Sequence, residues 1–149
     1  MNDPKHIIIH HSVSPDTYLK NFDAIKKWHI EHNGWKDIGY HYVLEDTYYG
    51  AKIYRGRSLI EEGAHAHGFN DRSIGICLVG NYDKDYPSYK RIVTLLNLCS
   101  SLILSFNIPI ENVLGHRETY TFLGKEVKKS CPGKNIDMYQ IRDALKIMS

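Results

Sequence analysis

Short apolar runs alternate with longer amphipathic segments along this chain, and that alternation predicts alternating strands and helices. Strands are expected where about four to eight mostly apolar residues are bounded by polar, glycine or proline residues. The triple isoleucine Ile7-Ile8-Ile9 is the clearest of these runs and reads as a buried strand. The predicted strands are His6 to His11, Gly39 to Leu44, Ala51 to Arg55, Ser73 to Gly80 and Asn112 to Leu114.

Three longer segments carry apolar residues three or four positions apart, which is the spacing of one helix face. Their starts carry capping residues or proline, and the first is followed by glycine. The predicted helices run from Ser14-Pro15 or Asn21 to Gly34, from Pro87 to Phe106, and from Asp137 to Met148. With a hairpin turn at Thr47 to Gly50, the pattern predicts an α/β fold: a central mixed β-sheet flanked by α-helices in a single domain, residues 1–149.

Composition restricts the classes of function without choosing one. The chain has 149 residues, 42% hydrophobic and 24% charged, which is typical of a globular domain. Its formal net charge of +2 does not indicate a nucleic-acid partner, because such partners usually require a concentrated basic patch. No stretch approaches the roughly 20 apolar residues of a membrane span, so no membrane insertion is expected.

The N-terminus lacks the basic start and long apolar core of a signal peptide, so we expect synthesis and folding in the cytoplasm. The 3 cysteines exclude a full disulfide framework, because their number is odd. Cys77 and Cys99 lie in apolar segments, where free cysteine is commonly a small buried hydrophobe. Only Cys131 lies in a polar loop.

Candidate chemistry concentrates in two late segments, Gly115-His116-Arg117-Glu118 and Lys129-Ser130-Cys131-Pro132. Imidazole and thiolate are the usual zinc ligands, and a catalytic zinc needs three protein ligands and one open position. A third ligand would come from His10-His11 at the end of the first predicted strand. Side chains alternate along a strand, so only one of this pair can face the site, and spacing alone does not choose between them.

Other candidates are weaker. His29 and His32 lie at helical spacing, but no third donor is near them in the sequence. Glu118 is a rival general base or a partner of a metal ligand, although an exposed loop glutamate is usually only solvated. His65 could be proposed as a fourth ligand of a structural zinc module. His67 in the same loop is expected at the rim of a groove.

Six motifs in order give the chain a resemblance to a known family. They are Ile9-His10-His11-Ser12, Gly39-Tyr40-His41-Tyr42, Ala64-His65, Ser73-Ile74-Gly75-Ile76, Gly115-His116-Arg117-Glu118 and Lys129-Ser130-Cys131-Pro132. In this combination the chain resembles the zinc N-acetylmuramoyl-L-alanine amidases of the phage-lysozyme and peptidoglycan-recognition-protein superfamily. The resemblance extends from about His6 to the last predicted helix.

The resemblance implies a role for each matching residue. It implies Zn²⁺ ligation by His10, His116 and Cys131, catalysis by Tyr40 and Lys129, and a place in the substrate groove for His65, with Asn70 of the same loop as a second expected substrate contact. His11 and His41 are then expected to point away from the site. The motifs do not decide whether Tyr40 or Glu118 assists the zinc-bound water.

The implied activity is hydrolysis of the amide between the lactyl group of N-acetylmuramic acid and L-alanine of the stem peptide. Peptidoglycan or muropeptides would be the partner, and we expect a monomer. The compact chain resembles a phage endolysin, a bacteriolytic enzyme that waits in the host cytoplasm and reaches the cell wall after release. The alternatives are a cytoplasmic muropeptide-recycling amidase and a non-catalytic peptidoglycan receptor, although members of the superfamily that only bind commonly lack the cysteine.

Overall fold

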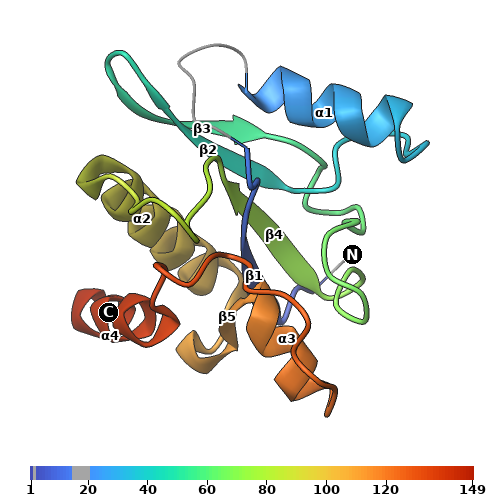
Figure 1. Ribbon diagram of the computed structural model, residues 1–149. Helices are drawn as coiled ribbons and strands as arrows, with labels where there is room; N and C mark the ends of the chain where they lie inside the picture. The colour runs from blue at the N-terminus through green and yellow to red at the C-terminus, as the bar shows by residue number, and fades with distance from the viewer. Residues whose placement is uncertain (2, 15–20) are drawn as a thin grey trace.

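A five-stranded mixed sheet organises the computed structural model, which describes residues 1, 3–14 and 21–149 (Figure 1). The strand order is β3-β2-β4-β1-β5, with β3 antiparallel to β2 and the other neighbours parallel. This confirms the predicted α/β class with a mixed sheet. The strands are β1 (His6–His11), β2 (Tyr42–Thr47), β3 (Gly50–Arg55), β4 (Ser73–Leu78) and β5 (Val113–Gly115).

Helices cover both faces of the sheet (Figure 1). They are α1 (Asn21–Glu31), α2 (Tyr89–Phe106), α3 (His116–Phe122) and α4 (Met138–Met148), with a 3-10 turn at Ile110–Asn112. None of the helices in the described ranges is long and apolar enough to cross a membrane. The assignment of the whole chain, residues 1–149, to one amidase domain remains a prediction.

The alternation of side chains along β1 divides the core into two layers. Ile7 and Ile9 belong to the cluster that also contains apolar side chains of α2 and α4. Ile8 faces the other way and packs with Phe69 and Leu114. His10 has the same parity as Ile8, so the pleat places its side chain on the face opposite α2 and α4. β1 is buried along its whole length, which is the usual position of a central parallel strand.

Two predicted starts differ from the structure. β2 begins at Tyr42 rather than Gly39, because the Gly39 carbonyl accepts from the backbone of Ala64 instead of a sheet neighbour. α2 begins after Ser88, whose hydroxyl accepts from the Arg91 N–H, so Pro87 precedes the cap. The proposed Ser14-Pro15 start of the first helix lies partly outside the described residues. The Asp137 cap of α4 is confirmed, since its carboxylate accepts from two backbone N–H groups.

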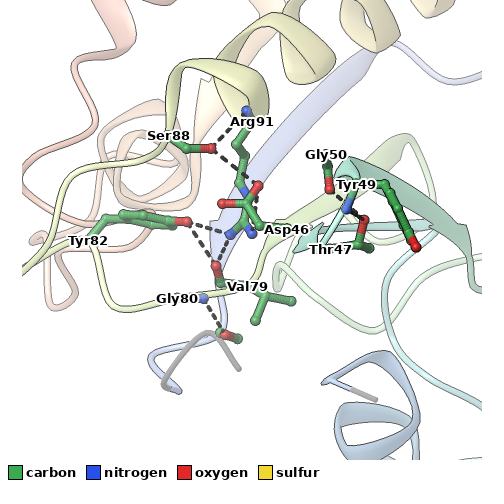
Figure 2. Close-up of polar contacts among 10 residues, drawn as sticks. Asp46, Thr47, Tyr49, Gly50, Val79, Gly80, Tyr82, Ser88 and Arg91 are labelled. Atoms are coloured by element: carbon green, nitrogen blue, oxygen red, sulfur yellow. Dashed lines mark hydrogen bonds and ion pairs between the residues drawn. The ribbon is translucent and has the colours of Figure 1, made fainter. Parts of the chain in front are cut away.

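A buried arginine joins α2 to two strand ends (Figure 2). Arg91 is fully buried, and its guanidinium donates to the Val79 carbonyl and the Tyr82 hydroxyl. The Asp46 carboxylate at the end of β2 lies 3.3 Å from the same guanidinium. The Ser88 hydroxyl donates to Asp46 at 3.2 Å. The network thereby fixes the loop that follows β4 against the start of α2.

Candidate metal centre

Strand register brings two histidines together at one edge of the sheet. β1 and β5 are parallel and pair Ile9 with Gly115, so the residues that follow this pair are His10 on β1 and His116 at the start of α3. Their ring centroids are 4.6 Å apart. In open α/β sheets, ligand sites form at the carboxyl ends of parallel strands, and this pair lies there.

Cys131 reaches the histidines on the loop that connects α3 to α4. The Arg117 N–H donates to the Cys131 carbonyl at 2.7 Å, and the Arg117 guanidinium donates to the carbonyls of Ser130, Gly133 and Ile136. A Cβ at Gly115 would lie 2.8 Å from Pro132 Cδ, so the loop can approach β5 only because residue 115 is glycine. The glycine and arginine on either side of His116 therefore position Cys131.

Asp83 holds the same loop from the opposite side. Its carboxylate accepts from the Ser130 hydroxyl at 2.8 Å and from the Lys134 N–H at 2.9 Å. These bonds, with the backbone bond as the largest cause, hold the pKa of Asp83 below its ordinary value. The neighbouring Tyr82 N–H donates to His11 Nδ1 at 3.1 Å, which connects this segment back to β1. Sequence reasoning missed Asp83, because it is about 50 positions from Cys131 and belongs to no motif.

The donor atoms of His10, His116 and Cys131 all lie within 4.8 Å of one another, and His10 Nδ1 is 3.8 Å from Cys131 Sγ. Tetrahedral zinc bound by nitrogen and sulfur places its donor atoms roughly 3.3 to 3.6 Å apart. Small side-chain rotations would bring the three donors to that spacing. The structure thus brings together the three predicted ligands, and their chemistry fits Zn²⁺.

Burial controls protonation at this cluster. Burial lowers the pKa of His116 to about 4 and lowers that of His10 well below its ordinary value, so both imidazoles are neutral at pH 7. Burial raises the pKa of the Cys131 thiol to about 11, against the opposing effects of the His11 backbone N–H and the Lys129 and Arg117 cations. At neutral pH the two imidazoles therefore offer lone pairs, and the thiol must lose a proton to bind a metal.

Both predicted catalytic residues lie at this cluster. The Tyr40 ring centroid is 5.1 Å from that of His10. Burial raises the pKa of Tyr40 well above its ordinary value, and a hydrogen bond with Cys77 adds to the shift. Lys129 is exposed, and its charge lowers the pKa of His10, His116 and Cys131. Tyr40 thus offers a protonated hydroxyl, and Lys129 offers a positive charge, beside the candidate ligands.

The Glu118 carboxylate is hydrogen-bonded to groups outside the candidate ligand set. Its carboxylate accepts from the Gly115 N–H at 2.8 Å, which caps the first turn of α3. It also forms a two-bond ion pair with Arg142 of α4, with both distances 2.9 Å. This arrangement orients the residue that begins α3, which is His116. The geometry favours a positioning role for Glu118 over the general-base role that the sequence left open.

His65 and Asn70 lie in the loop between β3 and β4. His65 Nδ1 is 2.9 Å from His10 Nε2, the ring nitrogen that faces away from Cys131. His65 therefore contacts His10 on the side of the ring away from Cys131, and it is not a fourth ligand of the site. The Asn70 side chain accepts from the backbone N–H groups of His65 and Ala66 at 2.8 and 2.9 Å. Substrate contact by either residue stays a prediction.

Four further histidines have structural partners. His11 is buried and stacks on Tyr82, whereas His41 accepts from the Gly75 N–H at 3.0 Å and its ring lies 5.8 Å from that of His65. Neither belongs to the cluster of candidate ligands. His29 accepts from the Gly39 N–H at 2.9 Å, while His32 stacks on Trp28, so the two do not form a metal pair. His67 is exposed and lines a cavity of about 40 Å³ beside His116, together with Thr119, Tyr120, Leu123 and Lys125.

Comparison with protein families gives one match that spans most of the chain. Residues 1–134 match the family Amidase_2, described as N-acetylmuramoyl-L-alanine amidase. The match includes all three candidate ligands as well as Tyr40 and Lys129.

Solved and curated proteins agree with that match. The structure of the N-acetylmuramoyl-L-alanine amidase LysC from Clostridium intestinale URNW is similar, with TM-score 0.79, 29% identity, and coverage of 97% of this chain and 86% of that one. Peptidoglycan-recognition protein LB of Drosophila melanogaster is 32% identical over 120 residues, which are 76% of this chain and 50% of that protein. The endolysin of Enterobacteria phage T3 is 36% identical over 77 residues, which are 52% of this chain and 48% of that protein. The chain therefore spans about half the length of these two curated relatives.

Proposed function

Because the chain belongs to the Amidase_2 family of N-acetylmuramoyl-L-alanine amidases, we propose that it is a zinc-dependent peptidoglycan amidase. It hydrolyses the amide between the lactyl group of N-acetylmuramic acid and L-alanine of the stem peptide. The observation that carries the proposal is the convergence of His10, His116 and Cys131 with their donor atoms within 4.8 Å. A non-catalytic receptor would have no need of this complete ligand set, so the retained Cys131 supports the enzyme.

The chain's own residues supply what amide hydrolysis needs besides the metal. When bound, Zn²⁺ would supply a hydroxide nucleophile near neutral pH by lowering the pKa of its water to about 7. Negative charge then develops on the carbonyl oxygen of the scissile amide, and positioned donors or cations stabilise it. Tyr40 donates its hydroxyl proton in a hydrogen bond to this oxygen, since its raised pKa makes it a poor base. Lys129 provides the positive charge.

The biological setting is proposed from the relatives. Similarity to LysC and to a phage endolysin supports a wall-lytic enzyme that accumulates in the producing cell's cytoplasm and acts after release. Similarity to a peptidoglycan-recognition protein supports peptidoglycan as the polymer that it contacts. A muropeptide-recycling amidase is the alternative within the same chemistry, and a substrate comparison separates the two. An endolysin must be active on intact walls, whereas a recycling enzyme should prefer soluble muropeptides.

The test uses purified bacterial cell walls and the full chain with Zn²⁺ added. New free amino termini on alanine without new reducing ends support the amidase, and new reducing ends would indicate a glycosidase instead. A chelator should abolish the activity and Zn²⁺ should restore it.

Cys131→Ala should lose both zinc and turnover, while the matched control Cys99→Ala, which alters a buried cysteine of α2, should keep both. Full turnover in Cys131→Ala would refute the ligand assignment.

A further inference from the structure

The His65 ring packs closely against the backbone of two glycines, Gly63 and Gly75. A Cβ at Gly75 of β4 would lie 2.6 Å from two atoms of this ring, and a Cβ at Gly63 would lie 2.4 Å from it. Asn70 fixes the loop by accepting from the backbone N–H groups of His65 and Ala66. The ring is therefore held on the sheet face that carries His10, with little freedom to turn toward the solvent.

A chain of hydrogen bonds behind His65 has a defined direction. The Ser73 hydroxyl donates its only hydrogen to the Phe69 carbonyl at 2.7 Å. At 3.3 Å from His65 Nε2, the Ser73 oxygen can then only accept, so His65 carries its hydrogen on Nε2. A neutral imidazole has one N–H, which makes His65 Nδ1 an acceptor. His10 Nε2, at 2.9 Å, must therefore donate to it.

The direction of this chain decides which nitrogen of His10 holds a lone pair. With its hydrogen on Nε2, neutral His10 has a bare Nδ1, and this atom faces Cys131 Sγ at 3.8 Å. We propose that Ser73 and His65 are positioning residues that fix the His10 tautomer so that the Nδ1 lone pair faces the metal. The inference rests on the proposed zinc site.

The arrangement departs from the usual partner of a metal-binding histidine. Such a histidine commonly donates its other N–H to a carboxylate, a backbone carbonyl or water. Here the acceptor is a neutral imidazole, which fixes orientation without adding negative charge to the site. The acceptor's own tautomer must then be fixed, and Ser73, which is fully buried, does this.

The first test measures zinc affinity by competition with a chelator. His65→Ala should weaken zinc binding by about 10- to 100-fold, the usual loss when a partner of a ligand is removed. His65→Asn should recover most of that loss, because its Oδ1 can replace Nδ1 as acceptor. Ser73→Ala should weaken binding in the same direction while changing little volume. His6→Phe, a control at a buried histidine of β1 whose ring contacts two phenylalanine rings edge-on, should leave the affinity unchanged.

The second test observes the tautomer directly in the metal-free protein. Nitrogen-15 NMR of wild-type protein should show His10 with its hydrogen on Nε2, and Ser73→Ala should show a mixture. A wild-type His10 with its hydrogen on Nδ1 would overturn the proposal whatever the zinc affinities are. Tight zinc binding that His65→Ala leaves unchanged would also overturn it while the proposed function stands. A wild-type protein that binds no zinc would refute the proposed function. The NMR measurement would still show which nitrogen of His10 carries the hydrogen.

Discussion

At the scale of single residues, the thiol of Cys131 determines how zinc binding depends on pH. Its pKa is raised to about 11, while burial lowers the pKa of His116 to about 4. Between those values the metal-free protein carries a proton on the thiol and none on the imidazoles. Zinc requires the thiolate, so binding releases one proton from the ligands.

We therefore predict that the apparent zinc affinity rises about tenfold per pH unit from pH 5 to pH 6.5, below the range in which zinc-bound water ionises. The measurement is chelator competition at several pH values, with proton release checked by calorimetry in buffers of different ionisation enthalpy. Cys99→Ala should give the same slope. A slope near zero would mean that the metal-free protein already holds a thiolate.

Lys129 is predicted to act on the reaction more than on the metal. Lys129→Ala should retain zinc and lower kcat by about 100-fold, since loss of one group that stabilises a developing oxyanion costs about 10²–10³. Lys128→Ala, which removes the adjacent exposed lysine, is the matched control and should stay near the wild-type rate. Equal losses in the two variants would mean that general positive charge near the wall polymer, and not a placed cation, explains the effect.

Residue patterns predicted the ligands better than they predicted the residues that hold them. The alternation of β1 required one of His10 and His11 to face the site, and the resemblance chose His10, which lies beside His116. The role of Asp83 was not predictable, because it depends on a contact between segments far apart in the sequence. Only the fold shows that Asp83 reaches the Ser130 hydroxyl, at 2.8 Å.

At the scale of elements, α3 is the helix that the apolar pattern did not predict. It has 7 residues, too few to show a helical repeat of apolar positions. Its start instead depends on polar groups, namely the Glu118 carboxylate on the Gly115 N–H and the ion pair with Arg142. The Glu118 side chain was visible in the sequence, but its partner Arg142 lies 24 positions away on another helix.

Glu118→Gln separates positioning from proton transfer. Glutamine can still accept from the Gly115 N–H but loses the charged pair with Arg142, so we expect a stability loss of about 0.5–1.5 kcal/mol in urea unfolding. We also expect kcat to fall less than tenfold, whereas loss of a general base costs about 10²–10⁴. Glu126→Gln, at an exposed carboxylate of the following loop, should change neither quantity. A fall of 100-fold or more with intact zinc binding would restore Glu118 as the base.

At the scale of the whole molecule, the loop that carries Cys131 is connected to the far side of the sheet through the segment after β4. Arg91 of α2 bonds the Tyr82 hydroxyl, and the Tyr82 backbone bonds both His11 and Asn135, at 3.1 and 2.9 Å. Asp83, the next residue, holds Ser130. The layer order follows from the sequence pattern, but this connection does not. An arginine in an amphipathic helix is expected to be exposed to solvent, whereas Arg91 is fully buried.

This connection predicts that Arg91→Ala weakens zinc binding as well as folding. Removing the guanidinium takes one donor from each of its buried acceptors, breaks the pair with Asp46 and opens a cavity, so we expect a loss of about 3–5 kcal/mol in urea unfolding. The matched control is Leu102→Ala, which also removes a buried side chain of α2, with an expected loss of about 2–5 kcal/mol. Zinc affinity is then measured at a temperature where both variants are folded. Because Leu102 has no polar link to Tyr82, its variant should bind zinc like the wild type, whereas Arg91→Ala should bind more weakly. Equal zinc affinity in the two variants would show that the Cys131 loop holds its position without the buried arginine.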